Sequence, residues 1–163
     1  MTETEFVTTL ADEIRRAVDG IKFPLEYHNS DEIVRVPINV YEGNLPKDAF
    51  NNDSYYPLIL VEWLSTNDEL DGSTAKTTMT AELNFGIFAP ESNGWKNSYH
   101  LTQTVRHHLL THRLIGNKFR LTDSATWEIA PDQPTPFFYT YATLIYQALQ
   151  PEDLLWRSQL ERW

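Results

Sequence analysis

The sequence lacks cysteine altogether, and its apolar runs are short. A chain of 163 residues without cysteine forms neither a disulfide framework nor a thiolate metal site, which fits a reducing compartment. The longest apolar run, residues 58–61, has the length of a strand and falls far short of the roughly 20 residues of a membrane-spanning helix. The first residues are acidic and amphipathic, so we expect neither a signal peptide nor a membrane partner.

Positive charge is scarce as well. The chain carries 13 lysine and arginine residues against 23 aspartate and glutamate residues, a formal net charge of −10. We therefore expect no sequence-specific binding of DNA or RNA, because such affinity comes mainly from neutralising phosphates. A local basic cluster lies between Arg106 and Arg120, and we interpret it as a solvated face near a negative helix C-terminus.

Two segments have the apolar periodicity of helices. The first, residues 5–19, is expected to be capped by Thr2 or Thr4 and to end at Gly20. The second is expected over residues 94–114. The predicted inward stripes are Phe6, Leu10, Ile14 and Val18 in the first helix, and Trp95, Tyr99, Thr102, Val105 and Leu109 in the second.

Several segments have the alternation or apolar content of strands. They are residues 33–41, 57–64, 75–89, 118–121, 125–129 and 137–147. Pro37 has no backbone donor, which predicts an edge or bulged strand there. Residues 42–56 show no period and are expected to form a long loop, and residues 65–72 are expected to form an acidic turn.

Together these segments predict an α+β fold. We expect a two-layer domain over residues 1–148, with a mostly antiparallel, mixed sheet of four to five strands and two main helices on one face. A β-hairpin is expected to protrude from one edge of the sheet. Residues 149–163 are expected to form a C-terminal extension that is helical, since Pro151 and the acids after it suit a first helical turn.

The chain contains no arrangement that indicates catalysis. It has no nucleophile elbow, no phosphate-binding loop and no dinucleotide fingerprint. His108 and His112 lie four residues apart, but the sequence indicates no third ligand for a metal. A calcium loop that begins at Asn67 would place Thr78 where a bidentate glutamate is required. We therefore expect no catalytic residue, no cofactor and no metal.

Interfaces are the more natural use of the unusual residues. Aromatic residues make up 13% of the chain, and tyrosine and tryptophan are enriched in subunit interfaces. The acidic turn and the apolar C-terminal residues are further candidates for contacts with partners. The predicted interface residues are Asp68, Glu69, Asp71, Tyr55, Tyr56, Leu154, Trp156 and Trp163.

The order of these parts resembles a known family. The run PLILVEW, an acidic hairpin, a long strand, a helix entered at Gly94 and Trp95, and then FRL and WEIAPDQPTPFFYTYATLIYQ are similar to tail terminator proteins of tailed phages and prophages, also called tail completion or head–tail joining proteins. The resemblance covers roughly residues 1–148. Residues 149–163 and the long 42–56 loop depart from the family pattern.

The resemblance implies a structural, non-enzymatic protein of the virion, present in the host cytoplasm during assembly. It implies a homo-oligomeric ring, usually of six copies, that caps the tail tube protein and contacts the head–tail connector protein. DNA would only pass through the lumen, where acidic residues would repel it. Two alternatives remain open: a small metal-dependent hydrolase using His108 and His112, and a monomeric cytoplasmic adaptor or binding protein.

Overall fold

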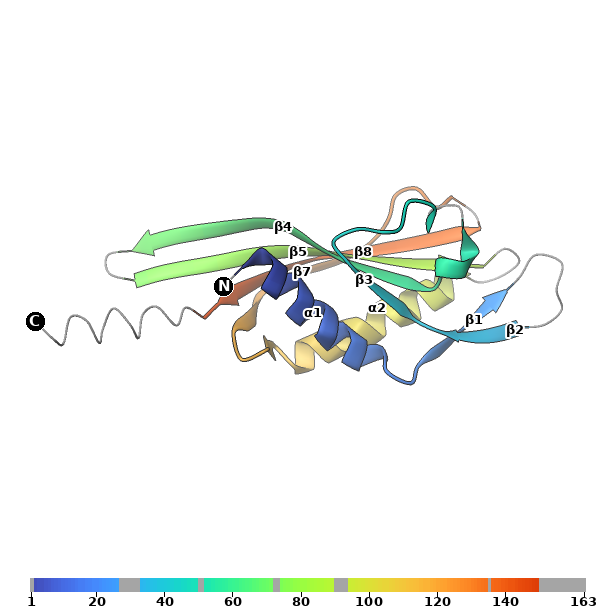
Figure 1. The fold of residues 1–163 in the computed structure, drawn as a ribbon, viewed down its shortest axis with the longest axis horizontal. Coiled ribbons are helices and arrows are strands. Elements are labelled where there is room, and N and C mark those ends of the chain that lie inside the picture. Colours follow the sequence, from blue (N-terminus) through green and yellow to red (C-terminus); the bar gives the residue numbers. More distant parts are fainter. Residues whose placement is uncertain are drawn as a thin grey trace, which may run out of the picture.

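The computed structural model describes residues 2–26, 33–49, 52–71, 74–89, 94–134 and 136–149. Two helices cover a curled six-stranded sheet, and a separate two-stranded sheet lies beside them (Figure 1). The elements are α1 (Glu3–Val18), β1 (Lys22–Glu26), β2 (Ile33–Pro37), β3 (Asn39–Glu42), η2 (Asp53–Tyr55), β4 (Leu58–Asp71), β5 (Thr74–Phe88), α2 (Gly94–Thr111), β6 (Leu114–Ile115), β7 (Phe119–Ile129) and β8 (Phe137–Ala148).

The large sheet has the strand order β3-β4-β5-β8-β7-β6. Every neighbouring pair is antiparallel except β3 and β4, which are parallel. The predicted α+β class and the mostly antiparallel, mixed sheet are therefore confirmed. The prediction of four to five strands is wrong, because the short β3 and β6 each add one strand at an edge, and β1 pairs with β2 outside the large sheet.

Helix α1 forms as its sequence predicts. The hydroxyl of Thr2 accepts a hydrogen bond from the backbone N–H of Glu5 at 3.1 Å, which caps the first turn. Phe6, Leu10 and Ile14 are fully buried, so the predicted stripe faces the core. Neither described helix is long and apolar enough to cross a membrane.

Helix α2 ends at Thr111, three residues before the predicted end, and its inward face also differs from the prediction. Trp95 and Tyr99 are 46% and 43% exposed, and their rings contact each other edge to face. A Cβ atom on Gly94 would lie 2.5 Å from Cδ2 of Phe138, so the first turn packs closely on β8 only with glycine there. This close approach turns one face of α2 inward. Its buried residues are Gly94, Ser98, Leu101, Val105 and Leu109.

The strand boundaries differ from the predictions in three places. The single strand expected at 33–41 is split at Ile38 into β2 and β3, which belong to different sheets. The two strands expected at 118–121 and 125–129 form one strand, β7, with a register shift between Leu121 and Ala125. The expected acidic turn, 65–72, is wrong, because β4 continues to Asp71 and pairs with β5 along that length.

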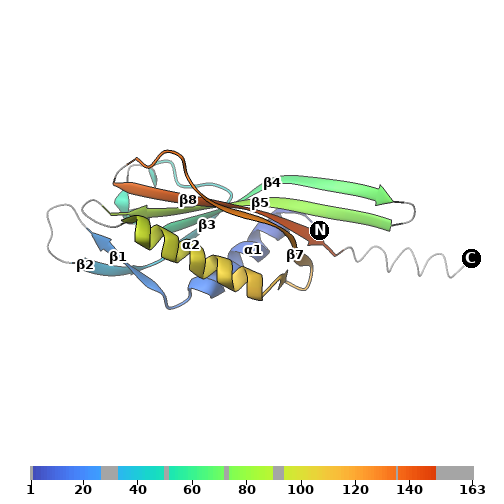
Figure 2. The same cartoon turned by 180° about the vertical axis from the view of Figure 1, so that it is seen from behind.

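Both helices pack on the same face of the sheet, as Figures 1 and 2 show from opposite sides. Alternate residues of β5 form the centre of this layer, and the alternation agrees with the prediction. The buried residues of β5 on this face are Met79, Ala81, Leu83, Phe85 and Ile87. The other face of the sheet has no α-helix among the described residues, and there Tyr56, Leu58 and Phe88 form a smaller core beside the short η2.

Candidate functional site

The outer edge of β4 is open along most of its length. Strand β3 pairs with β4 only as far as Val61, and no other described strand pairs with that side. Beyond this point Trp63 and Leu64 are exposed, and Leu70 is 83% exposed. An open edge with apolar side chains is a template on which another strand can pair.

A groove of about 410 Å³ runs between this edge and the first turns of α1. The indole N–H of Trp63 donates to Thr66 at 2.9 Å, which holds the ring at the rim. The groove is acidic, and its lining residues are Glu3, Thr4, Val7, Thr8, Glu42, Gly43, Glu62 and Trp63. Burial, and next the charge of Glu82, raise the pKa of Glu62 above its ordinary value, although a hydrogen bond from Asn84 lowers it. A cationic segment of a partner would fit this groove better than an anionic one.

The opposite edge of the sheet is open in a different way. Strand β6 pairs with β7 only at Phe119 and Arg120, and no other described strand covers the rest of β7. Exposed Ile129 and Arg106 border a groove of about 340 Å³ between β7 and α2. The remaining lining residues are Tyr99, Thr102, Gln103, Trp127, Glu128 and Thr140. The two open edges of one sheet therefore present unlike surfaces.

The predicted acidic residues lie on β4 rather than in a turn. Asp68 and Glu69 are exposed, and Asp71 is the last residue of the strand. The carboxylate of Asp68 accepts a hydrogen bond from the hydroxyl of Thr77 at 2.6 Å, and that of Glu69 accepts one from Asn67 at 3.0 Å. Two of the predicted interface residues therefore lie on the strand whose outer edge is open, although the Asp68 contact is with β5 on its paired side.

The predicted interface tyrosines have different environments. Tyr55 is half-buried, and its hydroxyl donates to Asp48 at 2.9 Å. Tyr56 is only 1% exposed, and its hydroxyl shares a hydrogen bond of 2.6 Å with that of Tyr139. The prediction of Tyr56 as an interface residue is wrong for its side chain, because it packs inside the smaller core. The predicted residues Leu154, Trp156 and Trp163 lie outside the described residues.

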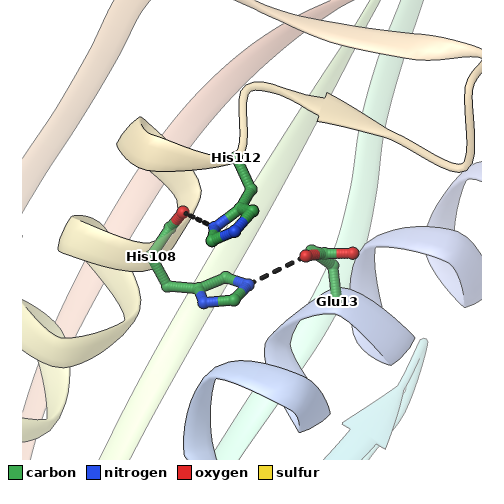
Figure 3. Close-up of side chains that lie close together, drawn as sticks. All are labelled: Glu13, His108 and His112. Carbon is green, nitrogen blue, oxygen red and sulfur yellow. Dashed lines mark hydrogen bonds and ion pairs between the residues drawn. The ribbon is translucent and has the colours of Figure 1, made fainter.

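A cluster of possible metal ligands lies where α1 packs against the end of α2 (Figure 3). Nε2 of His108 lies 2.8 Å from Oε1 of Glu13, and Arg16 donates to Oε2 of Glu13 at 2.5 Å. The ring of His112 stacks on that of His108 with centroids 4.3 Å apart. Sequence reasoning identified the two histidines and missed Glu13, which is 95 positions from His108 in the chain.

Electrostatics around Glu13 favour its ionised form. Burial opposes ionisation, but hydrogen bonds with His108 and Arg16 outweigh it, so the pKa of Glu13 lies below its ordinary value. Tyr146 is fully buried nearby, and its hydroxyl has no hydrogen-bond partner within the described part of the chain. Burial, and next the charge of Glu13, raise the pKa of Tyr146. The cluster thus combines an ionised carboxylate and two imidazoles.

Comparison with known proteins adds no assignment to this geometry. No model of a known protein family matches the chain, and a search of curated proteins finds no match.

Proposed function

We propose that this protein is a structural, non-enzymatic subunit of a phage or phage-like tail or neck. Copies of the chain form a ring that caps the tail tube and joins it to the head connector. The observation that carries the proposal is the pair of unlike open edges, at β4 and at β7, on one sheet.

Unlike edges favour head-to-tail contacts over two-fold contacts. In a ring, each subunit offers one surface to a different surface on its neighbour, and the last contact closes the circle. The β4 edge is acidic at Glu42 and Glu62, whereas the groove beside β7 holds Arg106 together with one acid, Glu128. Charge complementarity of this kind favours the pairing of β4 with β7 of a neighbour over the pairing of β4 with itself. The resemblance to tail terminators implies six copies.

The part of β4 after Val61 and the part of β5 that pairs with it form the second contact in this proposal. Past Val61, β4 has only β5 beside it among the described strands, and Leu70 is the most exposed large apolar side chain described. In Figure 1 these parts lie beyond the helices. We assign them as a protruding hairpin that reaches the neighbouring subunit or the tube protein by strand addition.

The acidic residues of this hairpin suit the passage of DNA. Asp68 and Glu69 are exposed on β4, and the whole chain carries a net charge of −10. Carboxylates at a lumen repel phosphates, so DNA slides through without binding. The protein then acts in the virion and is assembled in the host cytoplasm.

Native mass spectrometry of the full chain tests the proposal. We expect a closed oligomer at high concentration or with tube protein. Leu64→Lys on β4 and Ile129→Lys on β7 should each stop closure, because both side chains are exposed on open edges. Thr111→Lys is the matched control, since it lies outside both grooves and suits a helix C-terminus.

The outcomes separate the alternatives. A closed ring in the wild type and the control, but not in the edge variants, supports the proposal. A monomer under every condition favours an adaptor or binding protein. A two-fold dimer alone, even with tube protein, contradicts the head-to-tail arrangement.

A further inference from the structure

We propose that Glu13, His108 and His112 bind one divalent transition-metal ion and thereby tie α1 to the C-terminal end of α2. This inference goes beyond the ring function and does not depend on it. One ligand atom from each of the three side chains lies within 4.8 Å of the other two. Glu13 comes from α1, His108 from the last turns of α2, and His112 from the residue that follows α2 (Figure 3).

The types of ligand select the class of metal. Two imidazoles and one carboxylate form the set that zinc uses in open sites, with ligand distances of about 2.0–2.2 Å. Imidazole also suits copper, nickel and cobalt, whereas magnesium and calcium prefer oxygen ligands. The Glu13–His108–His112 set therefore favours zinc or a similar ion over magnesium.

Neighbouring hydrogen bonds orient the ligands. Arg16 holds Oε2 of Glu13, which leaves Oε1 for the metal. Nδ1 of His112 lies 3.1 Å from the carbonyl oxygen of His108 and donates its proton there, so Nε2 is the ring nitrogen that can bind the metal through its lone pair. Metal-binding histidines characteristically donate their other ring N–H to a carbonyl or carboxylate in this way.

When the metal binds, His108 must replace its hydrogen bond to Glu13 with a bond to the metal. Its Nε2 faces Oε1 of Glu13 at 2.8 Å, so the ion enters between these two atoms and replaces the hydrogen bond. The proton between them passes to solvent or to Nδ1 of the same ring. Two bonds to the metal then replace one hydrogen bond between α1 and α2.

The exposure of the three side chains shows how an ion can reach the site and where water can complete its coordination. His112 is exposed, whereas Glu13 is buried and the His108 side chain is 21% exposed. An ion therefore reaches the site from the His112 side, and water completes its coordination.

Metal titration of the chelator-treated, tag-free full chain tests the site. Isothermal titration with zinc is expected to give one ion per chain, and cobalt is expected to give visible absorption at the same stoichiometry. Free zinc at about 100 times its dissociation constant should raise the folding constant about 100-fold, seen as a higher Tm. Magnesium at the same concentration should leave the Tm unchanged.

Variants assign the ligands. His112→Ala should weaken zinc binding at least tenfold and still fold, because this side chain is exposed. His107→Ala, also exposed on α2, should bind zinc like the wild type. Glu13→Gln should weaken binding and remove the cobalt spectrum, provided that its far-UV circular dichroism matches the wild type. The proposal is overturned if the wild type binds no zinc, if His112→Ala binds it as tightly, or if His107→Ala loses it equally.

Discussion

Glu62 offers a change that should raise the stability of the chain and weaken its assembly at once. It faces Glu82 directly across the β4–β5 pair, and both carboxylates accept a hydrogen bond from Asn84 at 3.1 Å. Glu62→Gln keeps an oxygen that can accept from Asn84, and it removes the charge. The same side chain lines the acidic groove that we assign to a neighbouring subunit.

The sign of the effect follows from the pKa of Glu62. Burial, and then repulsion by Glu82, raise this pKa in the folded chain, so the folded chain holds the proton more tightly than the unfolded chain. The contribution of Glu62 to folding is therefore fully present below its unfolded pKa and is lost as the pH rises through its folded pKa. At pH 7 the charged wild type carries the penalty, and the glutamine variant does not.

The expected size is modest. Cross-strand pairs contribute about 0.2–1 kcal/mol, and like charges directly opposite are destabilising. We expect Glu62→Gln to raise the free energy of unfolding by about 0.5 kcal/mol at pH 7, or about 1–2 °C in Tm for a domain of this size. At pH 3.5, below the ordinary pKa of a glutamate of about 4.3, the Glu62 side chain is neutral in the folded chain, so the difference should vanish.

Urea unfolding at pH 7 and pH 3.5, with native mass spectrometry beside it, measures both effects. Glu69→Gln is the matched control for the unfolding measurement alone, because Glu69 faces Lys76 and its neutralisation relieves no like-charge contact. Glu62→Gln should also weaken self-association most at low salt. The reasoning is refuted if Glu62→Gln destabilises the chain at pH 7, or if its gain is the same at both pH values. Unchanged assembly would remove the groove from the proposed contact.

Three further changes test other parts of the structure. Tyr139→Phe should lower the free energy of unfolding in urea by about 1–2 kcal/mol, because it leaves the buried hydroxyl of Tyr56 without its partner. Tyr56→Phe should lower it less, because the half-buried Tyr139 is closer to water. Equal losses would contradict this reasoning. Gly94→Ala should cost about 2 kcal/mol by overpacking against Phe138, and an unchanged Tm would show that the contact is looser. Deleting residues 151–163 should weaken assembly, because this segment is rich in leucine and tryptophan, and an unchanged oligomer distribution would exclude it from the contact.

Local periodicity predicted the parts of the fold that one segment determines by itself. The four-residue stripe of α1 and the alternation of β5 are both confirmed, because each pattern repeats over several turns or pairs. The inward face of α2 could not be found in this way. Trp95 and Tyr99 are more apolar than Gly94 and Ser98, but the smaller residues allow the close approach to β8.

Contacts between distant segments account for the other differences. Residues 65–71 are poor strand formers, yet β5 pairs with all of them, so tertiary pairing overrides local preference. Glu13 is 95 positions from His108, and only the packing of α1 on α2 brings them together. In the same way the burial of Tyr56 depends on Tyr139, which follows it by 83 positions. A single sequence contains no local signal for such pairs.

An equimolar mixture of Leu64→Lys and Ile129→Lys tests the head-to-tail ring most directly. The first variant keeps an intact β7 edge and the second an intact β4 edge, so a single contact per pair remains possible if unlike edges meet. Native mass spectrometry should then show a one-to-one heterodimer and no larger species, while each variant alone stays monomeric and the wild type closes into a ring. A mixture that remains monomeric, or a variant that dimerises by itself, would contradict the account.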